Sequence, residues 1–82
     1  MSEEYVDKLL SNFCRRIREI RTDNDESQVD LADAIGTSQT MVARYERGAS
    51  MMSVLTLIKI CAHYKVSADY LLGIPESYSR PR

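Results

Sequence analysis

Serines and glycines divide this chain into short segments, and this pattern constrains the fold more than any other feature. A serine side chain can accept a hydrogen bond from the free amides at a helix start, and glycine readily takes the left-handed conformation that ends many helices. Segments with helical spacing of apolar residues follow five serines: Ser2, Ser27, Ser38, Ser53 and Ser67. Glycine closes three of these segments, at Gly36, Gly48 and Gly73. The pattern predicts five helices and no strand.

The first predicted helix is the longest, from about residue 3 to residue 22, and Ser11-Asn12 is a point where it could break. Its apolar residues recur at the i, i+3, i+4, i+7 spacing of one helix face. They are Val6, Leu9, Leu10, Phe13, Ile17 and Ile20. The apolar residues of the later helices are expected in the core by the same reasoning, among them Met41, Val42, Tyr45, Leu57 and Ile58.

The second and third predicted helices are separated only by residues 36–38, so the chain must turn tightly there. Two short helices joined by three or four residues that include a glycine form a helix-turn-helix. The sequence therefore predicts this motif in its middle third. The polar residues after Gly36 would lie at the leading end of the second helix of the motif.

Charge is distributed unevenly along the 82 residues, whose formal net charge is −1. Residues 1–35 carry nine acidic and five basic side chains, a net charge of −4. Residues 36–82 carry three acidic and six basic side chains, a net charge of +3. Because a local patch sets the field that a polyanion meets, the acidic total does not exclude a nucleic-acid partner.

Composition and motifs disfavour several classes of protein. Cys14, Cys61 and the single histidine, His63, form no metal-binding or redox motif, so we expect no metal, no cofactor and no enzyme active site. A redox role for either cysteine stays open. The most apolar stretch, VLTLIKIC, is too short to span a bilayer, and the acidic start lacks the features of a secretory signal. We expect a cytoplasmic protein without membrane association.

Four segments in register resemble the Cro/phage-repressor (XRE-type) DNA-binding domains of bacteria and their viruses. The segments are RIREIR in the first helix, SQVDLADAIG in the second, SQTMVARYERG in the third and VSADYLLG near the end. The resemblance covers about three quarters of the chain, from Phe13 to Gly73. It implies an all-α, compact five-helix domain like that of lambda repressor, with the helix-turn-helix at helices two and three. Residues 1–12 would extend the first helix, residues 13–74 would form the domain, and residues 75–82 would be a mobile tail.

The resemblance also implies roles for polar residues around the third helix. Four residues would face base edges in the major groove: Gln39, Thr40, Ala43 and Arg44. Three others would contact DNA phosphates and position the protein: Gln28, Ser38 and Arg47. Gln28 would also brace the third helix. These polar side chains could instead be solvated residues of a helix surface, and Arg44 could form a surface salt bridge.

Three further positions follow from the same resemblance. Arg21 and Glu46 match a pair that forms a partly buried ion pair in related repressors, and we expect that contact to orient the third helix. Glu26 stands where the family usually has an apolar residue. Lys65 stands where glycine is common, so either Lys65 adopts a left-handed conformation or the chain turns differently there.

The implied function is a sequence-specific transcriptional regulator, most simply a repressor, that binds double-stranded operator DNA as a homodimer without a small-molecule effector. A chain of this length leaves no room for a separate oligomerisation domain, so dimer contacts would come from helix five, a terminus or an exposed surface. That surface would be Met51, Met52 and Leu55, although one or two of them could pack onto the core. The alternative is a protein-interaction module on the same fold, such as an antitoxin or a regulator's adaptor.

Overall fold

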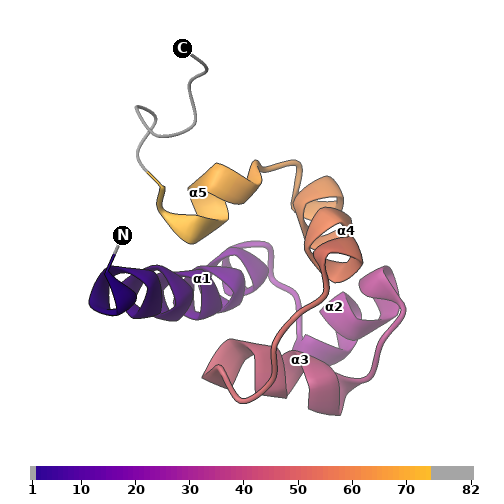
Figure 1. The fold of residues 1–82 in the computed structure, drawn as a ribbon. Helices are drawn as coiled ribbons and strands as arrows, with labels where there is room; N and C mark the ends of the chain where they lie inside the picture. Colours follow the sequence, from indigo (N-terminus) through magenta and orange to yellow (C-terminus); the bar gives the residue numbers. More distant parts are fainter. Residues whose placement is uncertain (1, 75–82) are drawn as a thin grey trace.

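The protein, described here over residues 2–74 of a computed structural model, contains five α-helices and no strand in that range (Figure 1). The helices are α1 (Glu3–Asp23), α2 (Gln28–Ile35), α3 (Gln39–Arg47), α4 (Val54–Tyr64) and α5 (Ala68–Leu72). The all-α, five-helix prediction is confirmed. α1 is continuous through Ser11 and Asn12, so the break considered there does not occur. The predicted tail at residues 75–82 lies outside the described residues.

Every helix begins after the serine that the sequence pattern indicates. Each serine Oγ accepts a hydrogen bond from the amide three residues further on, at distances between 3.0 and 3.2 Å. Such a cap satisfies a free helix donor and stabilises each helix by about 1 kcal/mol. At the start of α2, the Asp30 carboxylate also accepts from the Ser27 amide at 2.8 Å, which completes a reciprocal capping box.

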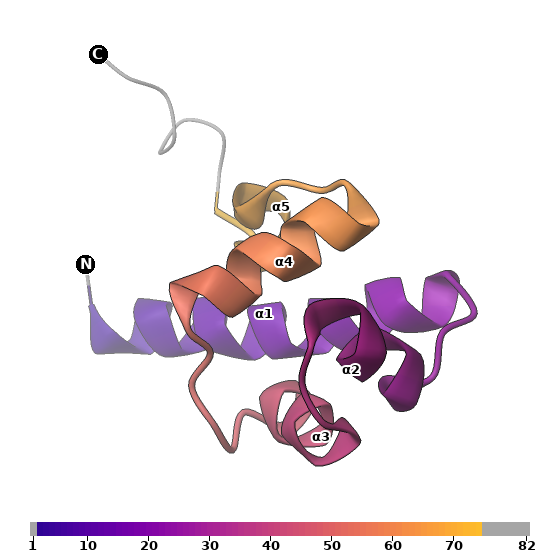
Figure 2. The ribbon, with the colours of Figure 1, turned by 90° about the vertical axis from the view of Figure 1, so that its right-hand side faces the viewer.

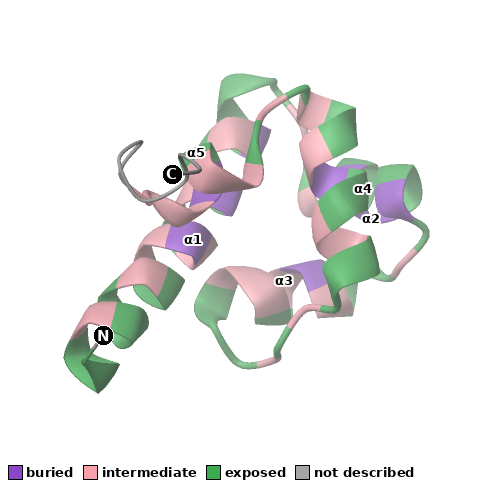
Figure 3. Ribbon diagram, turned by 45° about the horizontal axis from the view of Figure 1, so that its top comes forward, coloured by how far each residue is buried: buried purple, intermediate pink, exposed green. Residues whose placement is uncertain are grey.

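α1 packs mainly against α3 and α5. α3 lies on one side of α1 and α5 on the opposite side, as two perpendicular views show (Figures 1 and 2). α2 packs against both α3 and α4. The first turns of α1 project past the neighbouring helices and are largely exposed (Figure 3). This arrangement places the α2–α3 pair at one end of the domain, with α3 on the surface.

One cluster of apolar side chains joins all five helices. Its buried members are Phe13, Ile17, Leu31, Ala32, Ile35, Val42, Ile60 and Leu71. Fully burying one large aliphatic side chain stabilises a fold by about 1.5–3 kcal/mol. The cluster therefore fixes α3 to the rest of the domain through Val42, which is 1% exposed.

Three apolar residues of the predicted inward faces are exposed instead. Val6 and Leu10, at 47% and 37% exposure, belong to the part of α1 that projects past its neighbours. Ile58 is 57% exposed, so its predicted place in the core is wrong. The reason is geometric, because α4 directs Leu57 and Ile60 toward the core and successive residues of a helix point about 100° apart.

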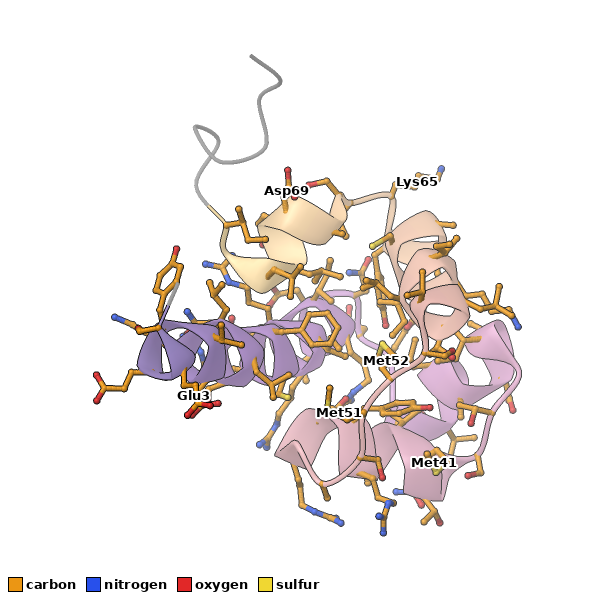
Figure 4. All side chains as sticks on the ribbon, in the orientation of Figure 1. Glu3, Met41, Met51, Met52, Lys65 and Asp69 are labelled. Atoms are coloured by element: carbon orange, nitrogen blue, oxygen red, sulfur yellow. The ribbon has the colours of Figure 1, made fainter. Side chains whose placement is uncertain are left out.

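Lys65 ends α4 in the left-handed conformation, with φ 58° and ψ 47°, which is the first of the two alternatives that the sequence left open (Figure 4). A residue with a Cβ is strained there by about 1–2 kcal/mol, and glycine is not. We predict that Lys65→Gly raises the free energy of unfolding by about 0.5–1 kcal/mol, because the relieved strain exceeds the entropy that glycine adds to the unfolded chain. Urea denaturation measures the change.

The matched control for this prediction is Lys59→Gly, which places glycine inside α4 at an exposed lysine. That change is expected to lower the free energy of unfolding by about 1 kcal/mol, since glycine is a poor residue in a helix interior. Destabilisation by Lys65→Gly would contradict the account of strain at residue 65.

Candidate nucleic-acid interface

α2 and α3 pack directly against each other and are joined by a tight turn at residues 36–38. Gly36 ends α2 in the left-handed conformation, with φ 72°, and the Thr37 amide donates to the Ala32 carbonyl at 2.9 Å. The chain then extends at Ser38, which caps α3. The helix-turn-helix predicted for the second and third helices is confirmed.

α3 has one side against the domain and one side on the surface. Val42 is buried, while Met41 and Tyr45 are half-buried and hold the helix in place. Met41 lies at the start of α3 (Figure 4). The predicted base-reading residues Gln39, Thr40 and Arg44 are exposed, and Ala43 is half-buried. Exposure permits these side chains to meet a ligand that lies along α3.

A chain of side-chain hydrogen bonds runs from α1 to the first residue of α3. Arg21 donates to both carboxylate oxygens of Glu46, from Nε at 2.7 Å and from Nη2 at 3.1 Å. Glu46 Oε1 also accepts from Gln28 Nε2 at 3.1 Å, and Gln28 Oε1 accepts from Gln39 Nε2 at 2.6 Å. The expected Arg21–Glu46 contact is present, and the structure extends it to Gln39.

The ion pair at the inner end of this chain is well shielded from solvent. The side chains of Arg21 and Glu46 are 10% and 4% exposed. Arg21 Nη1 also donates to the Glu26 carbonyl at 2.7 Å, so the guanidinium joins α1, α3 and the segment before α2. Its hydrogen bonds with Glu46 raise the pKa of Arg21 above its usual value. The pair therefore fixes the orientation of α3 relative to α1.

Gln39, at the outer end of this series of hydrogen bonds, keeps a donor and an acceptor that no other described residue uses. One N–H of its amide is used by Gln28. The second N–H and the Oε1 remain, and one donor with one acceptor is the combination that pairs with the major-groove edge of adenine. Gln28, expected both to contact a phosphate and to brace the third helix, contacts Glu46 and Gln39 of that helix, and its phosphate contact stays a prediction.

Arg44 and Arg47 differ in their surroundings, although both lie in the second half of α3. Arg44 Nε donates to Ser50 Oγ at 2.6 Å and Nη2 donates to the Ala49 carbonyl at 3.4 Å, which holds the guanidinium against the α3–α4 segment. Base reading by Arg44 requires exchange of these bonds and stays a prediction. The Arg47 side chain is exposed and makes no hydrogen bond or ion pair with another residue of the described range.

A polar cluster that ties the start of α2 to α4 was not predicted from the sequence. The half-buried Glu26 accepts a hydrogen bond from Tyr64 Oη at 2.6 Å and lies 2.8 Å from His63 Nε2. These partners are 37 and 38 residues away along the chain, so local spacing carries no signal for them. The only sequence signal was the acidic residue at a position that is usually apolar.

The Glu26 carboxylate is expected to make the stability of the protein depend on acid pH. Burial alone would raise the pKa of Glu26, but hydrogen bonds from Tyr64 and His63 outweigh it, so the pKa is lowered. Since the folded-state pKa lies below the unfolded one, this group stabilises the fold above the unfolded pKa of about 4.3, and the contribution is lost as pH falls through the folded value.

We predict that the loss of unfolding free energy from about pH 5 to about pH 3 is smaller in Glu26→Gln than in the original chain. The variant keeps the shape of the side chain and removes its negative charge, so residue 26 no longer titrates. Urea denaturation at several pH values measures the two slopes, and equal slopes would contradict the prediction.

The predicted dimer surface is exposed in part. Met51 and Leu55 are 78% and 60% exposed, whereas Met52 packs against the core (Figure 4). Val54 and Ile58 are also exposed, at 72% and 57%. Ile58 lies four residues after Val54 and three after Leu55, so it neighbours both on the surface of α4. We call Met51, Val54, Leu55 and Ile58 the α4 apolar patch.

The two cysteines and the acidic residues show little sign of redox chemistry or metal binding. Burial raises the pKa of Cys14 and of Cys61, which disfavours the reactive thiolate at neutral pH. Within residues 2–74, no group of three or more His, Cys, Asp or Glu side chains could hold a metal ion. None of the described helices has the length and apolar character needed to cross a membrane.

The tight turn at Gly36 and the exposed α3 define a helix-turn-helix domain, and comparison with known families agrees. The family profile described as Helix-turn-helix matches residues 17–71 of this chain. The chain therefore belongs to the helix-turn-helix family of XRE type, a family of DNA-binding regulators.

Two known proteins illustrate the similarity. One is YobD of Bacillus subtilis (strain 168), named an uncharacterized HTH-type transcriptional regulator, at 28% identity over 64 residues. The match covers 78% of this chain and 57% of YobD, so the chain spans little more than half of that relative's length. The other is the crystal structure of the restriction-modification controller protein C.AhdI from Aeromonas hydrophila, with a TM-score of 0.71 and 29% identity. That match covers 79% of this chain and 97% of the controller protein.

Proposed function

We propose that this protein is a sequence-specific DNA-binding transcriptional regulator whose α3 enters the major groove. The hydrogen-bonded chain from Arg21 to Gln39 is the observation that carries the proposal. It holds a glutamine in place at the first turn of an exposed helix, and a side chain fixed in advance loses less entropy when it pairs with a base. The names of YobD and C.AhdI, a transcriptional regulator and a controller protein, support the same class.

In this proposal the outer side of α3 is divided between base contacts and phosphate contacts. Gln39 pairs with adenine, and Thr40 hydrogen-bonds to a base edge or contacts a thymine methyl group. Ala43 offers a methyl contact, and Arg44 reaches guanine or a phosphate after it leaves Ser50. The phosphate contacts come from Gln28, Ser38 and Arg47, which position the protein without carrying sequence information.

We further propose that the protein binds operator DNA as a homodimer through the α4 apolar patch. Four large apolar side chains exposed together are unusual for a monomer and suit a symmetric interface. A twofold axis would set two α3 helices into major grooves about 34–36 Å apart. Repression by blocking polymerase in the cytoplasm is the simplest outcome of such binding.

Selection from a library of random DNA duplexes at low salt tests both proposals. We expect an enriched motif with twofold symmetry and half-sites about one DNA turn apart. Absence of binding to any duplex would sink the DNA-binding proposal and favour a protein-interaction module that uses the α4 apolar patch. A motif with a single, asymmetric half-site would overturn the homodimer only.

A further inference from the structure

A groove of about 440 Å³ lies between α1 and the last turn of α3, at the opposite end of α3 from Gln39. Its α1 wall includes Ser11, Cys14, Arg15 and Arg18, and its α3 wall includes Glu46 and Arg47. The four α1 residues follow the i, i+3, i+4, i+7 spacing and so form one stripe of that helix. This stripe is distinct from the one that carries Phe13 and Ile17 into the core.

Three guanidinium groups line this groove and are free to meet a ligand. The side chains of Arg18 and Arg47 are exposed and make no hydrogen bond or ion pair with any residue between 2 and 74. Arg15 has only an exposed contact with Glu19 at 3.8 Å and a hydrogen bond to Asn12 Oδ1 at 3.1 Å. A contact of this kind between exposed side chains is weak and easily exchanged.

The negative charge near the groove does not cancel these three cations. The Glu46 carboxylate is already bound by Arg21 and Gln28, and its side chain is 4% exposed. The carboxyl end of α3 carries a partial negative charge of roughly half a unit. Even when the Glu19 carboxylate 3.8 Å from Arg15 is counted, the groove keeps a net positive charge, although the chain as a whole has a net charge of −1.

The position of the groove relative to α3 indicates which anion it meets. From Gln39 to Arg47, α3 is about 12 Å long at a rise of 1.5 Å per residue. The major groove of DNA is also about 12 Å wide. A helix whose first turn contacts base edges therefore brings its last turn close to the phosphates at the groove wall. Arg47 lies at that last turn, and Arg15 and Arg18 line the same groove from α1.

We propose that the groove formed by Arg15, Arg18 and Arg47 is a second binding site for the phosphodiester backbone of DNA. The inference rests on the proposed function, and it adds α1 to an interface that otherwise consists of the helix-turn-helix. Because backbone contacts carry no base information, the site contributes affinity and salt dependence, and it leaves the base preference to Gln39 and Thr40.

The test compares Arg15→Gln/Arg18→Gln with a matched control, Lys8→Gln/Lys59→Gln. Both double variants remove two exposed positive charges, but Lys8 and Lys59 do not line the groove. Fluorescence anisotropy gives the affinity for the selected duplex and for a scrambled duplex over a range of salt concentrations. Thermal melting checks that both variants fold.

In Arg15→Gln/Arg18→Gln, we expect the affinity for DNA to fall roughly threefold to tenfold for each phosphate interaction that the substitutions remove. The loss should be equal for the selected and the scrambled duplex. The slope of log affinity against log salt should become shallower by about 1 for each of these interactions. Arg15→Lys/Arg18→Lys should restore most of the slope, because lysine also binds phosphate as a point charge.

The outcomes separate this inference from the proposed function. Suppose that the original protein binds with a preference that depends on Gln39, but that log affinity falls with log salt equally steeply in Arg15→Gln/Arg18→Gln and in the control Lys8→Gln/Lys59→Gln. The groove is then not a backbone site, and the proposed function stands. If Arg15→Gln/Arg18→Gln has an altered base preference but an unaltered dependence of affinity on salt, the groove proposal is likewise wrong. If the original chain binds no duplex, both proposals fail.

Discussion

Replacing Glu46 with alanine is expected to lower the free energy of unfolding by about 3 kcal/mol. The change leaves the Arg21 guanidinium, whose side chain is 10% exposed, without the carboxylate that it contacts through two nitrogens. Removing one partner of a buried ion pair costs about 3–5 kcal/mol, because the remaining charge is not compensated. In a domain of this size the melting temperature should fall by about 12 °C or more.

Calorimetry and urea denaturation measure this effect, and a double variant is its control. Arg21→Met/Glu46→Leu removes both charges at similar volume, so its cost should be well below the sum of the two single changes. A loss of less than about 1 kcal/mol in Glu46→Ala would contradict the view that the pair is buried and required for the fold.

Replacing Gln39 with alanine is expected to weaken binding to the selected duplex by about tenfold to a hundredfold for each half-site, with little change for a scrambled duplex. A bidentate pair between a side chain and a base contributes about 1–3 kcal/mol of discrimination. Gln39 is exposed and its side chain donates a hydrogen bond to Gln28 at the surface, so the fold should be retained. Competition binding with duplexes changed at one base pair identifies the position that it reads.

Gln28→Ala is the informative companion to this variant. It removes the acceptor that holds the Gln39 amide, so we expect a smaller loss of preference at the same base pair, together with weaker binding to all duplexes. An equal loss for selected and scrambled duplexes in Gln39→Ala would show that Gln39 contacts the backbone instead of a base.

The local features of the fold were predictable from the sequence. Ser27 with Asp30 and Gly36 with Ser38 act through backbone groups no more than five residues away, so their effects do not depend on distant packing. The Arg21–Glu46 pair was also predicted, although only by resemblance to related repressors, because the two residues are 25 positions apart.

Features that depend on the packing of distant helices were not predictable. The partners of Glu26 lie on α4, and no local pattern connects them to the segment before α2. Ile58 has the apolar character of a core residue, but the rotation of α4 places it on the surface. Arg44 was assigned to base reading from its place on α3. Its hydrogen bond to Ser50 spans only six residues, but it depends on the path that the α3–α4 segment takes between the packed helices.

By itself the sequence determined where the helices of this protein begin and end, and it placed a helix-turn-helix in the middle of the chain. Those properties follow from caps, left-handed glycines and apolar periodicity, which act over one or two turns. Only the tertiary structure decided how side chains meet across helices, including the extension of the Arg21–Glu46 pair through Gln28 to Gln39 and the basic groove between α1 and α3. The reason is physical: a contact between residues far apart in sequence depends on how the helices are rotated and packed, and the shared core sets that arrangement.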